Sequence, residues 1–85
     1  MPEISRFLGI VIYMYYHDHQ PPHFHAIYGD AEVTVDLDTG KVTGQFPRRA
    51  LALVLEWNQL RNVELQNRWE LARAKLPLER IAPLE

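Results

Sequence analysis

A tight turn at Gly29-Asp30 constrains the fold of this 85-residue chain more than any other feature. Gly-Asp between two runs rich in aromatic and β-branched residues is typical of a two-residue hairpin loop, so residues 23–28 and 31–36 are expected to be antiparallel strands. Counting outward from the turn aligns apolar residues on one face: Tyr28 with Ala31, Ala26 with Val33, and Phe24 with Val35. This agreement fixes the register and predicts an apolar sheet face on which another layer of secondary structure must pack.

The same register sets the residues of the opposite, polar face. It pairs Ile27 with Glu32, His25 with Thr34, and His23 with Asp36. Alternate residues of a strand point to the same side, so His23 and His25 should project together, about 6 to 7 Å apart. The polar face is therefore expected to place the Asp36 carboxylate beside a pair of histidines.

All four histidines lie within one stretch, residues 17–25, which Gln20-Pro21-Pro22 interrupts with a turn. The chain has no cysteine, so a divalent transition metal such as zinc would need histidine and carboxylate ligands. The candidate ligands are His23, His25 and Asp36, with His17 or His19 completing the set. The same histidines could instead serve as a general acid or base, or simply line a solvated sheet edge in an ordinary surface ion pair.

The chain around this hairpin reads as further strands. Residues 4–16 are rich in Ile, Val and Tyr and are expected to form one strand, with Gly9 at a bulge or a close backbone approach. A second turn at Thr39-Gly40 would pair Leu37 with Val42 and Val33 with Phe46. Three or four antiparallel strands in meander order are therefore expected over residues 4–46.

Residues 47–76 have helical periodicity, and Pro47 suits a first helical turn. Asn62 is expected to separate two helices, although one long bent helix over residues 48–76 fits the pattern too. The tail, residues 77–85, is extended by its prolines and should dock on the sheet edge or on a partner. The fold class is α+β: a single domain, residues 1–85, with two C-terminal helices packed on one face of the sheet.

Arg48 and Arg49 would lie at the N-terminal end of a helix, which is the unfavourable end for cations. Together with the free backbone N–H groups there, they could bind a small anion or a phosphate. The alternative is that they extend into solvent or pair with Glu32, Asp36 or another nearby carboxylate.

The net charge of −2 gives no broad attraction for nucleic acid or an anionic membrane. The longest apolar run, Phe7 to Tyr16, is too short to span a bilayer, and no signal peptide is evident. A cytoplasmic location is expected.

Three segments carry a family resemblance: residues 1–7, residues 15–26, and Pro47-Arg48-Arg49-Ala50-Leu51 with Glu56-Trp57. They resemble the small prokaryotic domain-of-unknown-function family 4160, and Pro-Pro-His-Phe-His is the most specific part. Members of that family vary at His17 and His19, which implies that His23 and His25 are the better candidate ligands. The family has no settled activity, and its members resemble components encoded beside domain-of-unknown-function family 2442 in a layout like that of toxin and antitoxin pairs.

These observations lead to three predicted functions. The first is a small cytoplasmic interaction module of a two-protein, toxin/antitoxin-like prokaryotic system, whose protein partner is a family 2442 protein. The second is a toxin-like ribonuclease that uses His23 or His25 as acid or base and Arg48 or Arg49 to hold RNA phosphate. The third is a metal-binding domain based on the histidine cluster. The sequence does not decide whether two copies of the chain also pair through their sheets.

Overall fold

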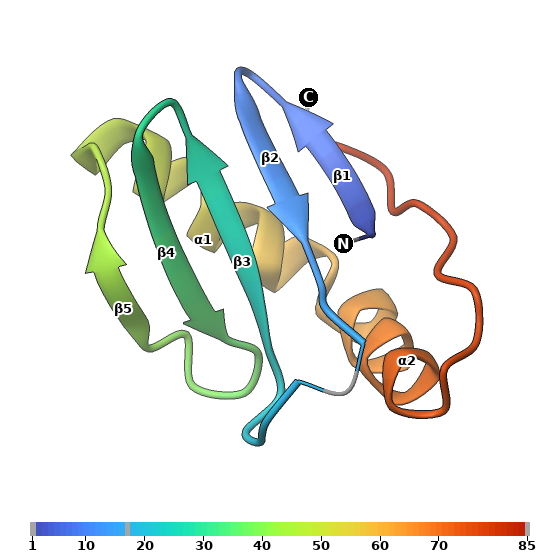
Figure 1. The fold of residues 1–85 in the computed structure, drawn as a ribbon. Coiled ribbons are helices and arrows are strands. Elements are labelled where there is room, and N and C mark those ends of the chain that lie inside the picture. The colour runs from blue at the N-terminus through green and yellow to red at the C-terminus, as the bar shows by residue number, and fades with distance from the viewer. Residues whose placement is uncertain (1, 17, 85) are drawn as a thin grey trace.

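The computed structural model describes residues 2–16 and 18–84 and shows an antiparallel sheet followed by two helices (Figure 1). The five strands neighbour one another in chain order: β1 (Glu3–Phe7), β2 (Ile10–Tyr13), β3 (His23–Tyr28), β4 (Ala31–Asp36) and β5 (Val42–Gln45). They are followed by α1 (Arg48–Leu60) and α2 (Asn62–Arg73). The predicted α+β fold, with a meander sheet and two C-terminal helices, is confirmed.

The prediction of one strand over residues 4–16 was wrong, because Leu8 and Gly9 form a tight turn between β1 and β2. Their φ angles of 51° and 82° place both residues in the left-handed region that a two-residue hairpin loop requires. Leucine is an unusual residue at such a position, so the apolar run concealed the turn. The sheet therefore has five strands instead of three or four.

The predicted register between β3 and β4 is confirmed at all six pairs, from His23 with Asp36 to Tyr28 with Ala31. The predicted register between β4 and β5 was wrong by two residues, since Val35 pairs with Val42 and Val33 with Gly44. The connecting turn is longer than expected because Asp36 Oδ1 accepts the N–H groups of Asp38 and Thr39, both at 2.8 Å. A shift of two keeps every side chain on its face, so strand alternation alone could not reveal it.

The core lies between the sheet and the helices: α1 crosses behind the strands in Figure 1, and α2 adds the buried residues Leu65, Trp69 and Ala72. Trp57 of α1 is fully buried and packs against Phe7 and Phe24, with ring centroids 5.4 and 5.6 Å apart. The opposite face, called the outer face below, includes a cross-strand row formed by Tyr13, His25, Thr34 and Thr43. The apolar face predicted from the register is thus the covered one.

The chain breaks between the two helices at Arg61, where φ is −111° and ψ is 18°. Residues 48–73 therefore form two helices rather than one bent helix. Asn62 Nδ2 donates to the Leu37 carbonyl at 2.7 Å and to Asn58 Oδ1 at 3.1 Å, which joins the start of α2 to the end of the sheet. Neither helix in the described part of the chain is long and apolar enough to cross a membrane.

The tail runs beside β1, the first strand of the sheet (Figure 1). The Ile81 N–H donates to the Ile4 carbonyl at 2.7 Å, and Ser5 Oγ donates to the Ile81 carbonyl at 3.0 Å. Ile81 and Leu84 are both buried. The tail thereby covers the edge of β1, and β5 forms the other edge of the sheet.

Candidate metal centre

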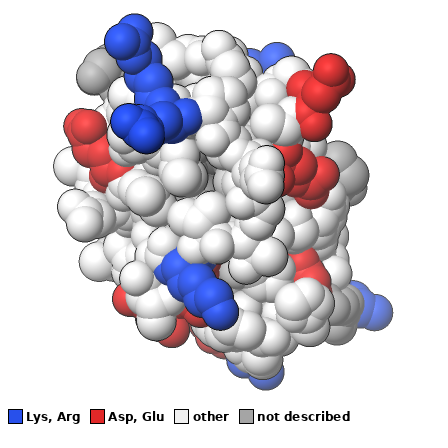
Figure 2. Space-filling model, turned by 90° about the vertical axis from the view of Figure 1, so that its left-hand side faces the viewer, with Lys and Arg blue, Asp and Glu red and all other residues white. Residues whose placement is uncertain are grey.

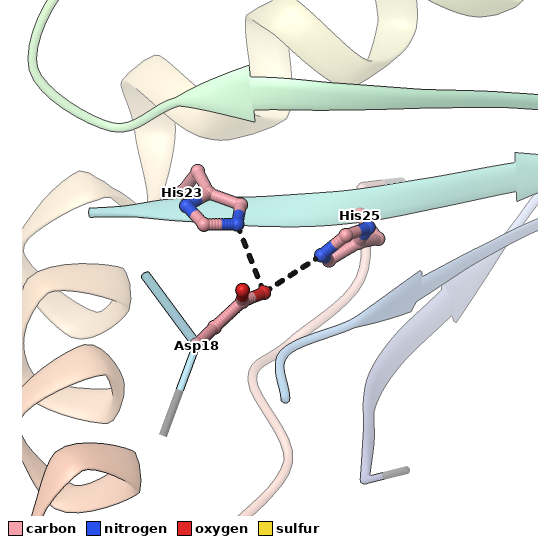
Figure 3. A group of neighbouring side chains, drawn as sticks. All are labelled: Asp18, His23 and His25. Carbon is pink, nitrogen blue, oxygen red and sulfur yellow. Dashed lines mark hydrogen bonds and ion pairs between the residues drawn. The ribbon is translucent and has the colours of Figure 1, made fainter. Parts of the chain in front are cut away.

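Two histidines of β3 and one aspartate of the preceding loop converge on the outer face (Figure 3). Asp18 Oδ2 lies 2.9 Å from His23 Nε2 and 3.0 Å from His25 Nε2. The three ligand atoms lie within 4.8 Å of one another. Asp18, His23 and His25 are called the Asp-His-His cluster below.

The local sequence explains this convergence. His23 and His25 alternate along β3 and therefore share its outer face. The Pro21-Pro22 segment sends the chain into β3 after a turn, and Asp18, five residues before His23, lies over the start of that strand. Loop and strand together supply ligands that neither would supply alone.

Hydrogen bonding fixes the proton of His23. Its Nδ1 lies 2.6 Å from the Pro21 carbonyl. A carbonyl oxygen can only accept, so Nδ1 carries the proton of this hydrogen bond. The Nε2 lone pair can then point toward the cluster, which is the tautomer that a metal-binding imidazole needs.

His25 has the same orientation, with Nε2 toward Asp18 and Nδ1 away from it. His25 Nδ1 is buried and makes no hydrogen bond within residues 2–16 and 18–84. Glu32 Oε2 lies 3.5 Å from it, slightly too far for a hydrogen bond. A small movement of the exposed Glu32 side chain would complete a carboxylate–histidine contact behind the cluster.

The cluster is largely shielded from solvent, with side-chain exposures of 6% for His23, 14% for His25 and 15% for Asp18. Burial opposes ionisation of Asp18, but hydrogen bonds from His25 and the His19 backbone, together with the electrostatic effect of His23, outweigh it and lower the pKa of the carboxyl group. Asp18 is therefore an anionic ligand at neutral pH. The ring centroids of Tyr15 and His25 lie 4.3 Å apart, and those of Trp69 and His23 lie 5.2 Å apart. These neighbouring rings restrict how far either imidazole can turn.

The structure places the other predicted ligands differently. His17 lies outside the described residues. His19 has an 80% exposed side chain, its Nδ1 bonds to the Gln20 carbonyl, and its Nε2 lies 3.7 Å from Asp18 Oδ1, so it lies beside the three residues of the cluster without joining them. Asp36 lies opposite His23 as the register required, but its carboxylate accepts N–H groups of the following turn. The hydrogen bond from the Thr39 backbone is the main reason that the pKa of Asp36 is lowered.

Arg48 and Arg49 open α1 and are exposed, at the far end of the sheet from the cluster. Arg49 lines a small apolar cavity together with Tyr28, the last residue of β3. The five residue steps from His23 to Tyr28 amount to about 16 Å. The structure therefore does not bring the histidines and these arginines together as the ribonuclease prediction required. Within the described part of the chain, neither arginine forms an ion pair with a carboxylate.

Sequence reasoning missed Asp18 as a member of the site. Register arguments apply only to strand residues, and Asp18 lies in a loop that has no register. The available signal was its position between His17 and His19, three residues before the Pro21-Pro22 turn that directs the chain into β3.

The fold and the cluster define a class: small α+β domains that present two imidazoles and one carboxylate on the outer face of an antiparallel sheet. A family model described as "Domain of unknown function (DUF4160)" matches residues 9–70, and the chain belongs to this family. The matched segment contains the whole Asp-His-His cluster. A search of curated proteins and a search of solved structures found no match.

Proposed function

We propose that this domain binds a divalent transition metal ion through Asp18, His23 and His25. One observation carries the proposal: two imidazole Nε2 atoms approach the same carboxylate oxygen, while the Pro21 carbonyl holds the proton of His23 on the opposite ring nitrogen. Imidazole nitrogen and carboxylate oxygen are ligands that zinc and related first-row metals share.

The size of the cluster fits such an ion. Ligand atoms about 2.0 to 2.2 Å from a tetrahedral ion lie about 3.3 to 3.5 Å from one another. The two nitrogen–oxygen distances of 2.9 and 3.0 Å would therefore have to open by only about half an ångström. Three protein ligands leave at least one position for water or substrate, as in catalytic sites rather than closed structural ones.

The test is a titration of untagged, metal-stripped protein with Zn²⁺ by calorimetry and with Co²⁺ by visible absorption. We expect one ion per chain, and a loss of affinity of at least about 100-fold when His25→Ala or Asp18→Ala removes one of three ligands. His19→Ala is the matched control, because His19 lies beside the cluster with an exposed side chain. Equal binding by His25→Ala and the parent, or no binding by the parent, would overturn the proposal.

We further propose that the domain is a cytoplasmic interaction module that pairs with a second protein through β5. The Asp36 N–H bonds to the Lys41 carbonyl, and backbone bonding alternates along antiparallel strands, so the N–H and C=O groups of Val42 and Gly44 point away from β4. The tail covers the β1 edge but does not extend to β5. An extended segment of a partner could add to this open edge as a further strand.

The charges beside β5 favour an acidic partner segment. Lys41 directly precedes the strand, Arg48 and Arg49 follow it closely, and all three are exposed. Figure 2 views the side of the molecule on which β5 lies and shows basic and acidic side chains at separate places around a largely uncharged surface. Antiparallel pairing of two copies through β5 would bring these cations together, which argues against a homodimer at this edge.

A family 2442 protein encoded beside the gene, as in a toxin/antitoxin-like pair, is the partner to test. We expect a 1:1 complex by light scattering, and we expect Val42→Pro to abolish it. Proline at this position removes an N–H group that faces away from β4 and leaves the internal ladder intact. A complex that Val42→Pro leaves unchanged would show that the partner binds elsewhere.

A further inference from the structure

A groove on the outer face adjoins the Asp-His-His cluster. It has a volume of about 410 Å³, and His23 forms part of its wall together with His19, Thr34, Lys41 and Thr43. The imidazole that would hold the ion is thus also a wall of the groove. A volume of this size accommodates a small organic ligand.

The groove offers hydrogen-bond donors suited to an oxyanion. Thr34 and Thr43 are cross-strand neighbours on β4 and β5; both line the groove, and each side chain carries a hydroxyl group. Lys41 contributes a flexible ammonium group with three N–H donors. A phosphate group, with oxygen acceptors in several directions, matches this combination better than a planar carboxylate does.

One acidic residue, Asp36, also lines the groove. Its Oδ1 atom accepts the backbone N–H groups of Asp38 and Thr39, so this oxygen is directed into the turn. The carboxylates of Asp36 and Asp18 still set two negative charges against the single charge of Lys41. A divalent ion on the cluster would reverse this balance and make the region attractive to an anion.

We propose that the groove binds the phosphate group of a small phosphorylated ligand, held between Lys41 and the metal ion at His23. This inference rests on the metal site proposed above. The sequence pattern had suggested Arg48 and Arg49 as phosphate ligands. In this proposal the cation that holds the phosphate is Lys41, which lines the same groove as His23. Metal and phosphate binding are then coupled, so phosphate must tighten metal binding by the factor by which metal tightens phosphate binding.

The experiment uses full-length protein loaded with one equivalent of Co²⁺, after metal binding has been established on the same sample. Inorganic phosphate, phenyl phosphate and acetate are titrated separately, and the visible absorption of the cobalt ion is recorded. We expect both phosphate compounds to change the spectrum saturably, phenyl phosphate to bind at least as tightly as inorganic phosphate, and acetate to bind more weakly. Metal-stripped protein should show no calorimetric binding of either phosphate compound.

Lys41→Met should weaken phosphate binding by about tenfold or more, as expected for the loss of a charge-assisted hydrogen bond, with unchanged cobalt affinity in the absence of phosphate. Lys75→Met is the matched control, because Lys75 is the other lysine of the chain and lies beyond α2. Three results would each overturn the inference while leaving the metal site intact: no response to phosphate, equal response to acetate, or unchanged binding by Lys41→Met. Failure of the parent protein to bind cobalt would overturn both proposals.

Discussion

Asp18 Oδ2 lies 2.9 Å from His23 Nε2, although a loop with two prolines separates the two residues. The same oxygen lies 3.0 Å from His25 Nε2. One carboxylate oxygen therefore occupies the point toward which both imidazoles are directed. Side chains beyond the cluster can therefore affect metal binding by contacting the ring nitrogens that face away from Asp18.

Glu32 is the first of these side chains. When His25 Nε2 binds a metal ion, its Nδ1 carries a proton that faces Glu32 Oε2, at 3.5 Å in the present structure. We expect Glu32→Gln to weaken zinc binding by about 10- to 100-fold, the usual effect of losing a carboxylate behind a metal-bound histidine. Competition with a zinc-sensitive dye measures the change. Glu56→Gln on the exposed surface of α1 serves as the control, and equal zinc affinity of both variants would show that Glu32 does not orient His25.

Glu3 should make stability depend on pH. Hydrogen bonds from Arg6 and Arg80 lower the pKa of Glu3 from 4.5 to about 2. Because the folded-state pKa lies below the ordinary value, ionised Glu3 stabilises the fold above about pH 4.5, and this contribution is lost as the pH falls toward 2.

Urea denaturation at a series of pH values between 5 and 2 measures this loss. We expect Glu3→Gln to have a shallower dependence of the unfolding free energy on pH than the parent. A variant with the same pH profile as the parent would show that the ion pairs of Glu3 add no stability in solution.

Asn62 connects α2 to the end of the sheet, because its amide donates to the Leu37 carbonyl at 2.7 Å and to Asn58. Asn62→Ala would leave both acceptors without this donor, and Asn58 is buried. We expect a loss of about 1 to 3 kcal/mol in the free energy of unfolding, measured by urea denaturation. Asn67→Ala, at an exposed position of the same helix, should change stability by less than about 0.5 kcal/mol. Similar effects of both variants would contradict a connecting role for Asn62.

Replacing Gly44 and Gly29 by alanine separates two effects: backbone strain at a positive φ, and a steric clash of the new Cβ atom. Both have a positive φ, 109° and 60°. A Cβ atom at Gly44 would lie 2.6 Å from the Glu32 carbonyl oxygen, whereas a Cβ at Gly29 meets nothing within 4 Å. We expect Gly29→Ala to cost about 1 to 2 kcal/mol through backbone strain alone. Gly44→Ala should cost at least about 1 kcal/mol more, because β4 must also move. Equal thermal stabilities would mean that β5 shifts freely away from β4.

The parts of the fold that the sequence predicted are those in which side-chain chemistry and geometry agree. Gly29-Asp30 made the β3–β4 register predictable, and the helical periodicity of residues 47–76 made the two helices predictable. Leu8-Gly9 was missed because leucine gives no turn signal within an apolar run. The β4–β5 register was missed because the hydrogen bonds of Asp36 lengthen a turn without changing which residues face the core.

The candidate site was also predictable only in part. Strand alternation placed His23 and His25 together, but the choice of Asp36 over Asp18 followed from pairing alone. Pairing reports which strand residues are neighbours and says nothing about which loop returns over them. The prediction that Arg48 and Arg49 act beside the histidines met a related limit, since sequence order does not show which end of the sheet the start of a helix reaches.

The contact between the tail and β1 also has a consequence for how the chain is made. Ile81 supplies the N–H that bonds to Ile4, so β1 is completed by a segment that is synthesised only after the whole sheet and both helices. While the rest of the chain is still on the ribosome, β1 exposes an unpaired edge that could associate with a neighbouring nascent chain. Productive folding on a polysome therefore depends on how quickly Ile81 leaves the exit tunnel relative to such encounters.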